Sequence, residues 1–246
     1  INTPIPVVPT CHYMMGGLPT NVHGQVMTLN KEGQDQVVAG LYAAGECACV
    51  SVHGANRLGG NSLLDLVVFG RSAGLHVEES LKQDLPLLAI SEDDLDLALA
   101  RLNRWNQSTQ GESLVEIRHA MQKTMQTDFG VFRTAKYMQE GLVKLKELKQ
   151  RLNHAVLSDQ SQVFNTARIE ALELDNLMEV AYASAVSALT REESRGAHSR
   201  EDFPKRDDKN WLKHLLYFTI EAKIAYRAVN RKPLTVPPME LKDRVY

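Results

Sequence analysis

Two glycine-rich loops carry side chains suited to binding a molecule with two carboxylates. His12 lies in the first loop, residues 9–17, and Arg57 lies in the second, residues 53–63. An arginine guanidinium is a planar fork that can hold a carboxylate through two hydrogen bonds, and a histidine can donate to a second carboxylate. The sequence therefore predicts that the two loops face one cleft in which His12 and Arg57 bind a dicarboxylate. The alternative for His12 is a histidine that only packs in the core or caps a helix.

An acidic residue and a predicted helix start near these loops are suited to a flat, sugar-bearing ligand. Glu46 directly follows the glycine-bounded run 40–45, and a carboxylate just past a strand can accept hydrogen bonds from a sugar-like hydroxyl. Asn61, Ser62 and Leu63 open a predicted helix, whose free N–H groups would stabilise an anion. In a reduced flavin that anion is the N1–C2=O edge of the ring. The alternative is a tight strand-to-helix turn in which Asn61 or Ser62 is an ordinary N-cap.

The cysteines and the arginine-rich stretch give weaker indications of a functional site. Cys47 and Cys49 lack a second ligand pair at zinc spacing, so we expect buried thiols. With Cys11 they make an odd number of cysteines, which indicates no disulfide framework and favours a reducing compartment. The arginine-rich stretch 195–206 could bind an anion or a partner, but ion pairs with nearby carboxylates are the simpler explanation. The sequence has no Walker A, G-x-G-x-x-G, H-E-x-x-H or G-x-S-x-G motif, so nucleotide hydrolysis and zinc proteolysis have no support.

The elements that must position the loops follow from the spacing of apolar residues. Residues 37–45 form a short apolar run ended by glycine, which predicts a buried strand, and residues 62–81 have helical spacing. The following hundred residues are predicted to be helical. Their most regular pattern is a seam with apolar residues at every third or fourth position, which predicts the core of a helical bundle. The seam consists of Phe164, Ala167, Ala171, Leu174, Met178, Ala181, Ala185 and Ala188.

Changes in composition divide the chain into three predicted domains. Residues 1–83 are rich in glycine and are predicted to form a loop-rich α/β segment that contains strands. Residues 84–192 are predicted to form an all-α bundle. Residues 193–246 are predicted to form a small α+β domain, in which residues 211–217 and 223–229 could pair as strands.

The overall composition excludes several classes of protein. The chain has 246 residues, with 28 Lys+Arg against 30 Asp+Glu and 43% hydrophobic residues, which is ordinary for a globular protein and gives no electrostatic footprint for general nucleic-acid binding. The longest nearly unbroken apolar stretch, residues 63–69, is far shorter than the ~20 residues of a membrane-spanning helix. The chain begins at Ile1 without a signal-peptide pattern, so we expect a piece of a longer protein.

These features together resemble the flavoprotein subunits of the succinate dehydrogenase (complex II) family. The resemblance rests on the loop 9–17, on Gly45-Glu46-Cys47, and above all on the run HGANRLGGNSLLD at residues 53–65. It continues through residues 193–204 to the closing Arg-Val-Tyr, and so follows the whole chain in order.

For the reaction, the resemblance implies the oxidation of succinate to fumarate. In the family a hydride passes from one methylene carbon to the flavin while a base takes a proton from the other carbon, and an iron–sulfur subunit passes the electrons on to quinone. His12 and Arg57 inherit dicarboxylate binding from this resemblance. The proton-transferring arginine of the family is expected upstream of Ile1, so no residue here is assigned a catalytic role, and we expect the chain alone to be inactive.

For the cofactor, the resemblance implies FAD, attached covalently in the full-length family through a histidine that has no counterpart here. It implies that residues 1–83 are the C-terminal portion of the Rossmann-like FAD-binding domain and carry its substrate and flavin loops. Glu46 inherits the contact with the ribityl region, while Ser62 and Leu63, with Asn61 beside them, inherit contacts with the flavin ring. No metal ligand, no nucleic acid and no membrane span of the chain's own are expected.

The implied partners are the iron–sulfur subunit and the membrane anchor subunits of complex II. The implied location is peripheral, on the cytoplasmic face of the bacterial inner membrane or, alternatively, on the matrix side of the mitochondrial inner membrane.

Three alternatives stay open. Fumarate reductase flavoproteins and L-aspartate oxidase share the histidine and arginine positions, although residues 59–61 and 210–214 resemble succinate dehydrogenase more closely. In a different class of function, the alanine-rich seam and its bundle could make the chain a non-catalytic docking module.

Overall fold

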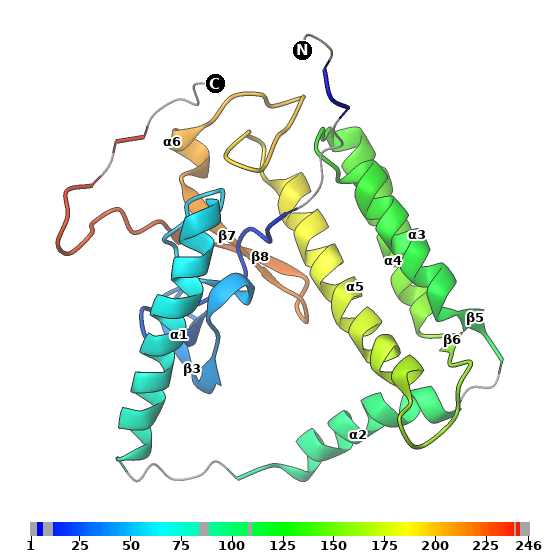
Figure 1. Cartoon of the computed structure of the whole chain (residues 1–246). Coiled ribbons are helices and arrows are strands. Elements are labelled where there is room, and N and C mark those ends of the chain that lie inside the picture. The colour runs from blue at the N-terminus through cyan, green and yellow to red at the C-terminus, as the bar shows by residue number, and fades with distance from the viewer. Residues whose placement is uncertain (1–3, 7–11, 84–88, 108–109, 239, 242–246) are drawn as a thin grey trace. The chain divides into compact units, whose positions relative to one another are not determined.

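A computed structural model describes residues 4–6, 12–83, 89–107, 110–238 and 240–241. The chain forms two compact units, which we describe separately (Figure 1). Unit 1 comprises Ile1–Asp84, Asp208–His214 and Tyr226–Tyr246, and unit 2 comprises Leu85–Asp207 and Leu215–Ala225. The three predicted domains stay a prediction, because the proximity of segments does not establish which part folds by itself.

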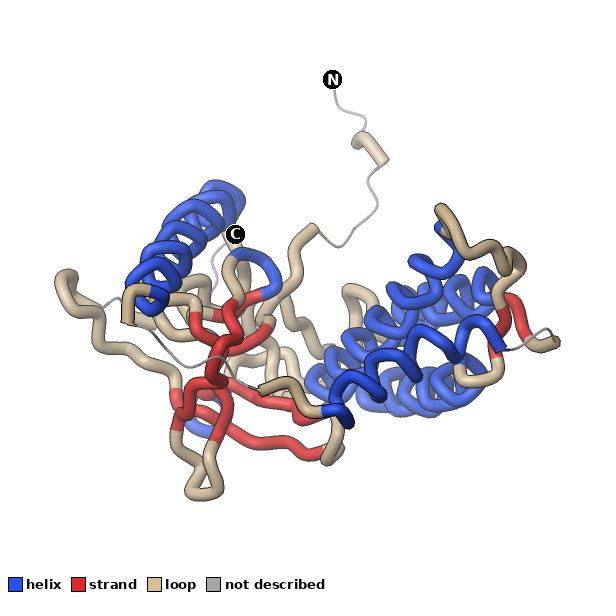
Figure 2. The backbone as a smooth tube through the Cα atoms, turned by 90° about the horizontal axis from the view of Figure 1, so that it is seen from below, coloured by secondary structure: helices blue, strands red, loops and turns tan. Residues whose placement is uncertain are grey.

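Unit 1 consists of short strands and one long helix. Its elements are β1 (Leu18–Pro19), β2 (Gln25–Leu29), β3 (Asp35–Tyr42), the 3-10 helix η1 (Gly45–Cys47), β4 (Ala48–Cys49), α1 (Gly59–Leu81) and the short α6 (Asp208–Trp211). β2 and β3 form an antiparallel hairpin and β1 pairs in parallel with β4. Figure 2 shows the strands of the described residues as such short pairs.

The predicted order of strand, glycine-rich loop and helix is confirmed, but the predicted burial of the strand is wrong. Most residues of β3 are exposed. The reason is that, among the described residues, β3 has β2 as its only strand neighbour. An apolar run alone could not reveal this, because it does not say what covers the strand.

The β1–β4 pair brings the first loop to the segment that precedes the second loop. Leu18 pairs with Ala48, and just before this pair Gly17 has a φ of +128°. A Cβ atom at Gly17 would lie 2.6 Å from the carbonyl oxygen of Cys47. Only glycine permits so close an approach in this backbone conformation, so Gly17 keeps the two segments in contact.

Unit 2 is built mainly from helices. Its elements are α2 (Glu92–Gln107), β5 (Glu112–Ser113), α3 (Leu114–Asp128), α4 (Ala135–Leu152), β6 (Ala155–Val156) and α5 (Thr166–Thr190). α3, α4 and α5 pack against one another (Figure 1). Side chains mark the helix starts, as the Thr134 hydroxyl accepts from the Tyr137 N–H and the Asn165 carbonyl oxygen accepts from the Arg168 N–H at 2.8 Å.

The alanine-rich seam lies on α5, as predicted, with one exception. Ala171, Leu174 and Ala185 are completely buried in the core of unit 2. Phe164, however, lies before the first turn of α5, has a φ of +53° and is 97% exposed. Its place in the seam was therefore wrong, because Asn165 caps the helix and the chain leaves the core at that point.

The predicted pairing of strands near the C-terminus is confirmed. β7 (Lys213–Phe218) and β8 (Lys223–Ala228) form a two-stranded hairpin whose turn includes Ala222 at a φ of +47°. Residues of this hairpin belong to both units.

Candidate functional site

The second loop leads directly into α1, and the helix starts earlier than the sequence predicted. Leu58 is the N-cap and Gly59 the first helical residue, so neither Asn61 nor Ser62 is the N-cap. The Ser62 N–H donates to the Leu58 carbonyl oxygen at 2.9 Å, which is the first bond of the helix. The N–H groups of Gly59, Gly60 and Asn61 precede that bond and form the positive end of α1.

Arg57 is buried, and its guanidinium donates to several groups of unit 1. Its Nε donates to the Met14 carbonyl oxygen at 3.0 Å, and its Nη1 donates to Asp65 Oδ2 at 2.8 Å. Its Nη2 reaches three backbone carbonyl oxygens, those of Ala48 at 3.0 Å, Gly45 at 3.3 Å and Glu46 at 3.4 Å. A bound carboxylate would therefore have to replace some of the carbonyl contacts.

The prediction that the two glycine-rich loops meet is confirmed by direct contacts. The backbone N–H of Arg57 lies 3.1 Å from Met15 Sδ, in addition to the bond from its side chain to Met14. Glu46 joins the same loop, because its Oε1 accepts from the Met14 N–H at 2.6 Å. These contacts make one cluster of the segments that the sequence singled out.

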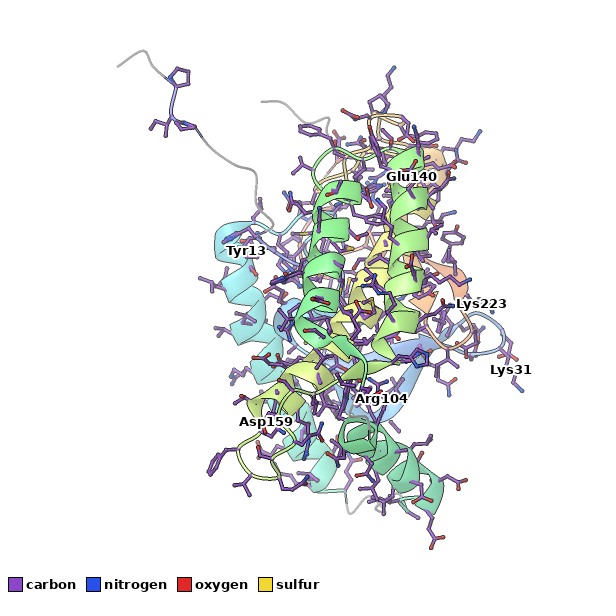
Figure 3. The ribbon with its side chains drawn as sticks, turned by 90° about the vertical axis from the view of Figure 1, so that its right-hand side faces the viewer. Tyr13, Lys31, Arg104, Glu140, Asp159 and Lys223 are labelled. Atoms are coloured by element: carbon purple, nitrogen blue, oxygen red, sulfur yellow. The ribbon has the colours of Figure 1, made fainter. Side chains whose placement is uncertain are left out.

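His12 is exposed and so is not a core histidine. Its ring lies 4.3 Å from that of Tyr13, measured between ring centroids. The Tyr13 hydroxyl is 3.5 Å from the Gly59 carbonyl oxygen, so this loop lies at the start of α1 (Figure 3). The dicarboxylate-binding role of His12 stays a prediction.

A small hollow of about 20 Å³ lies between the loops. Its lining includes Met15, Ser51, His53 and Arg57. A space of this size holds about one water molecule. A four-carbon dicarboxylate is larger, so the hollow by itself cannot enclose one.

Two side chains of the cluster were missed from the sequence. The His53 Nε2 lies 2.7 Å from Asp65 Oδ2, and the same oxygen accepts from Arg57. One signal was available for Asp65, because it is the only charged residue in the apolar stretch 63–69 and lies two turns after Arg57. For His53, nothing in the sequence except its position beside the second loop indicated that it belongs to this cluster.

The start of α1 fits one edge of FAD. Its leading N–H groups supply the positive end that an anionic ring edge needs. A Cβ atom added at Gly60 would meet no atom within 4 Å, and Leu63 is 66% exposed, so a flat ring has access to this helix end. Glu46 is also exposed, but its Oε1 is already used by Met14.

The predicted burial of the thiols can be compared with the structure for two of the three cysteines. Cys47 is exposed, so its predicted burial is wrong, whereas Cys49 is half-buried; both are free thiols. Cys11 lies outside the described residues. Among the residues that the structure describes, no group of His, Cys, Asp and Glu is arranged to hold a metal ion.

The arginine-rich stretch contains the ion pairs predicted for it. Glu193, which is completely buried, lies 2.7 Å from Arg195 and 2.5 Å from Arg191. Arg200 pairs with Asp202 at 2.7 Å. The hydrogen bond from Arg200 holds the pKa of Asp202 down to about 2. Burial raises the pKa of Glu193, but the hydrogen bonds from Arg195, the Asp207 N–H and Arg191 outweigh it and leave that pKa lowered.

A helix that spans a bilayer must combine sufficient length with a nearly continuous apolar surface. No helix among the described residues meets both requirements.

Comparison with protein families gives two matches, which are separated by residues 64–117. The profile described as "Fumarate reductase flavoprotein C-term" matches residues 118–246. The profile described as "FAD binding domain" matches residues 2–63. The second match contains both glycine-rich loops of the site.

Curated relatives match nearly the whole chain. The chain is 60% identical over 241 residues to a succinate dehydrogenase flavoprotein subunit of Coxiella burnetii, covering 98% of this chain and 41% of that protein. It is 44% identical to a mitochondrial succinate dehydrogenase [ubiquinone] flavoprotein subunit of Oryza sativa, covering 99% of this chain and 39% of that protein. The chain thus spans about two-fifths of the length of these relatives.

Solved structures agree in fold. An E. coli quinol fumarate reductase matches with a TM-score of 0.80 and 38% identity, over 98% of this chain and 40% of the other. The Sdh1 complex of Mycobacterium smegmatis, solved with UQ1, matches with a TM-score of 0.74 and 30% identity, over 95% of this chain and 37% of the other.

Proposed function

The chain belongs to the family of fumarate reductase flavoprotein C-terminal regions, and from this premise we propose that it is part of a succinate dehydrogenase flavoprotein subunit, which oxidises succinate to fumarate. The observation that carries the proposal is the cluster in which Arg57 of the second loop donates to Met14 of the first. It unites the two segments whose residues are suited to a dicarboxylate.

In this proposal Arg57 and His12 bind the two carboxylates of succinate. Arg57 exchanges its longer contacts, those with the carbonyl oxygens of Gly45 and Glu46, for oxygens of the substrate. The gain is a charge-assisted bond in a buried place, which is stronger than a bond to a neutral carbonyl. Holding both carboxylates orients the carbon atoms between them.

FAD is the proposed cofactor, and when bound it supplies the hydride acceptor. The free N–H groups of Gly59, Gly60 and Asn61, with the exposed Leu63, are proposed to face the ring edge. Ser62 is buried and its N–H is bonded to Leu58, so its proposed contact with the ring is the weakest of the set. Glu46 is proposed to face the ribityl chain with the oxygen that does not bind Met14.

The proposed partners are an iron–sulfur subunit and the membrane anchor subunits, which would place the chain peripherally at a membrane. Relatives of this chain come from bacteria and from mitochondria. We propose the cytoplasmic face of a bacterial inner membrane, with the matrix side of the mitochondrial inner membrane as the alternative.

The test is the substitution Arg57→Lys in the whole flavoprotein within its complex. Lysine keeps the charge but loses the planar fork, so we expect kcat/KM for succinate to fall by about 100-fold, with FAD content unchanged. Arg71→Lys, on an exposed arginine of α1, is the matched control and should leave kcat/KM within about twofold. An Arg57→Lys enzyme as efficient as the control would refute this site.

The rate of fumarate reduction, measured on the same complex, distinguishes the related activities. A fumarate reductase would reduce fumarate faster than it oxidises succinate, and an L-aspartate oxidase would accept L-aspartate. A docking module would keep its assembly with partner subunits after Arg57→Lys and show no succinate oxidation in any preparation.

A further inference from the structure

Asp65 is the one carboxylate that forms an ion pair with Arg57 within the part of the chain that the structure describes. Its Oδ2 lies 2.8 Å from Arg57 Nη1, and each side chain is only 3% exposed. A buried guanidinium is costly unless an opposite charge compensates it, and removing one partner leaves the other unpaired. Arg57 therefore depends on Asp65 for its place below the surface.

The remaining hydrogen bonds of Arg57 to the backbone are of a different kind. They reach the neutral carbonyl oxygens of Met14, Gly45, Glu46 and Ala48, over distances of 3.0 to 3.4 Å. A ligand carboxylate can replace such a carbonyl with a gain in charge compensation. The bond from Nη1 to Asp65 is the shortest of the set, so it anchors one side of the guanidinium while the other side is exchangeable.

His53 is held by the same carboxylate oxygen. Its Nε2 lies 2.7 Å from Asp65 Oδ2 and 3.1 Å from Arg57 Nη1. One ring nitrogen cannot donate to the carboxylate and accept from the guanidinium at once, so the shorter contact assigns the proton to Nε2. Asp65 thus connects two of the side chains that line the hollow to the rigid helix α1.

We propose that Asp65 is a positioning residue for dicarboxylate binding, holding Arg57 and His53 at the hollow without touching the substrate. The inference rests on the proposed function and deepens it. It assigns to α1 a second role, because the start of this helix is offered to the cofactor, and Asp65, nearly two turns after that start, anchors the arginine that binds the substrate.

The test uses the whole flavoprotein in its complex and the substitution Asp65→Asn. Asparagine keeps the shape but removes the charge. We expect the Kd for malonate, a dicarboxylate that is not oxidised, and the KM for succinate to rise by about tenfold or more, with a smaller change in kcat and an unchanged FAD content.

Two further variants accompany this test: Asp65→Glu, which retains the charge, and Asp128→Asn, which is the matched control. Glutamate retains the charge but displaces the carboxylate, so we expect a malonate Kd between those of the unmodified and Asp65→Asn enzymes. Asp128 is also buried and paired, with Lys144 at 2.8 Å, but it lies on α3 in unit 2. Asp128→Asn should leave the malonate Kd within about twofold, whatever it costs in stability.

The outcomes separate the two proposals. If Arg57→Lys weakens malonate binding and Asp65→Asn does not, the positioning role is overturned and the proposed function stands. If neither substitution weakens binding, the proposed site fails as well. If Asp65→Asn does not fold, Asp65→Glu decides, because a malonate Kd equal to that of the unmodified enzyme overturns the positioning role.

Discussion

At the scale of single residues, His198 shows how hydrogen bonds fix a protonation state. Its Nδ1 lies 2.9 Å from Arg133 Nη1, and its Nε2 lies 3.0 Å from the Arg191 carbonyl oxygen. Arginine can only donate and a carbonyl can only accept, so Nδ1 is the acceptor and Nε2 carries the proton. Burial and the charges of Arg133, Arg200 and Arg191 lower the pKa of His198 to about 4.

This pKa predicts how the stability of the folded chain depends on pH. In the unfolded chain His198 has a pKa near 6.5. Between pH 6.5 and 4 it is therefore protonated in the unfolded chain but neutral in the folded chain. The free energy of unfolding is therefore unaffected by His198 above about pH 6.5. It decreases as the pH drops towards 4, by at most about 3 kcal/mol. The carboxylates Glu193 and Asp202, whose pKa values are lowered, contribute losses only below about pH 4.5.

The measurement is the urea midpoint between pH 4.5 and 7, followed by circular dichroism. His198→Gln should flatten the profile in this range, whereas His154→Gln, at an exposed histidine, should not. A profile that keeps its slope after His198→Gln would show that another group causes it.

Arg57 marks the limit of sequence reasoning at this scale. Its type and its glycine-rich surroundings predicted a carboxylate ligand, and the contact between the two loops was predicted as well. The sequence did not reveal that the guanidinium is buried against its own chain, because burial depends on Asp65 and on carbonyl oxygens from η1 and β4. Every residue has a backbone carbonyl group, so the residue types do not show which of these groups accept hydrogen bonds from Arg57.

At the scale of elements, Gly141 determines how closely α4 approaches the end of α3. A Cβ atom there would lie 2.7 Å from the Cβ of Asp128 and would overlap the ring of Phe129. Both positions belong to the tight connection that ends α3. The helix accepts a glycine in its interior because this contact leaves no room for a larger residue.

Gly141→Ala should therefore destabilise the chain, although alanine is the better helix former. The gain in helix propensity is about 1 kcal/mol, and overpacking costs about 1–3 kcal/mol, so the expected net loss is about 1 kcal/mol. Gly74→Ala on α1, where a Cβ meets no atom within 4 Å, is the control and should be neutral or stabilising. Calorimetry of both variants decides, and a higher Tm for Gly141→Ala would contradict the predicted clash.

Periodicity predicted the helices of unit 2 because their packing repeats along the chain. Ala171 to Ala185 follow the predicted seam, since each turn of α5 meets the same kind of surface. Phe164 fitted the spacing equally well, but spacing cannot detect the capping bond of Asn165, after which the helix starts at Thr166. The exposure of β3 escaped prediction for a related reason, because a strand's apolar side chains do not reveal which elements cover them.

At the scale of the whole molecule, the chain spans about two-fifths of its curated relatives and contains both loops of the candidate site. Sequence motifs predicted the family because the run at residues 53–65 is long and specific. They could not predict the size of the space beside Arg57. That space depends on everything that surrounds the loops.

The size of the hollow leads to a prediction for the 246 residues studied alone. The hollow of about 20 Å³ holds about one water molecule, and the donors of Arg57 already have acceptors in the chain. We therefore expect malonate at about 1 mM to give no binding heat with this chain in titration calorimetry, while the whole flavoprotein binds it. A Kd below 1 mM for the 246 residues would contradict this, and would mean that Arg57 releases its carbonyl contacts unaided and that these two loops suffice to hold a dicarboxylate.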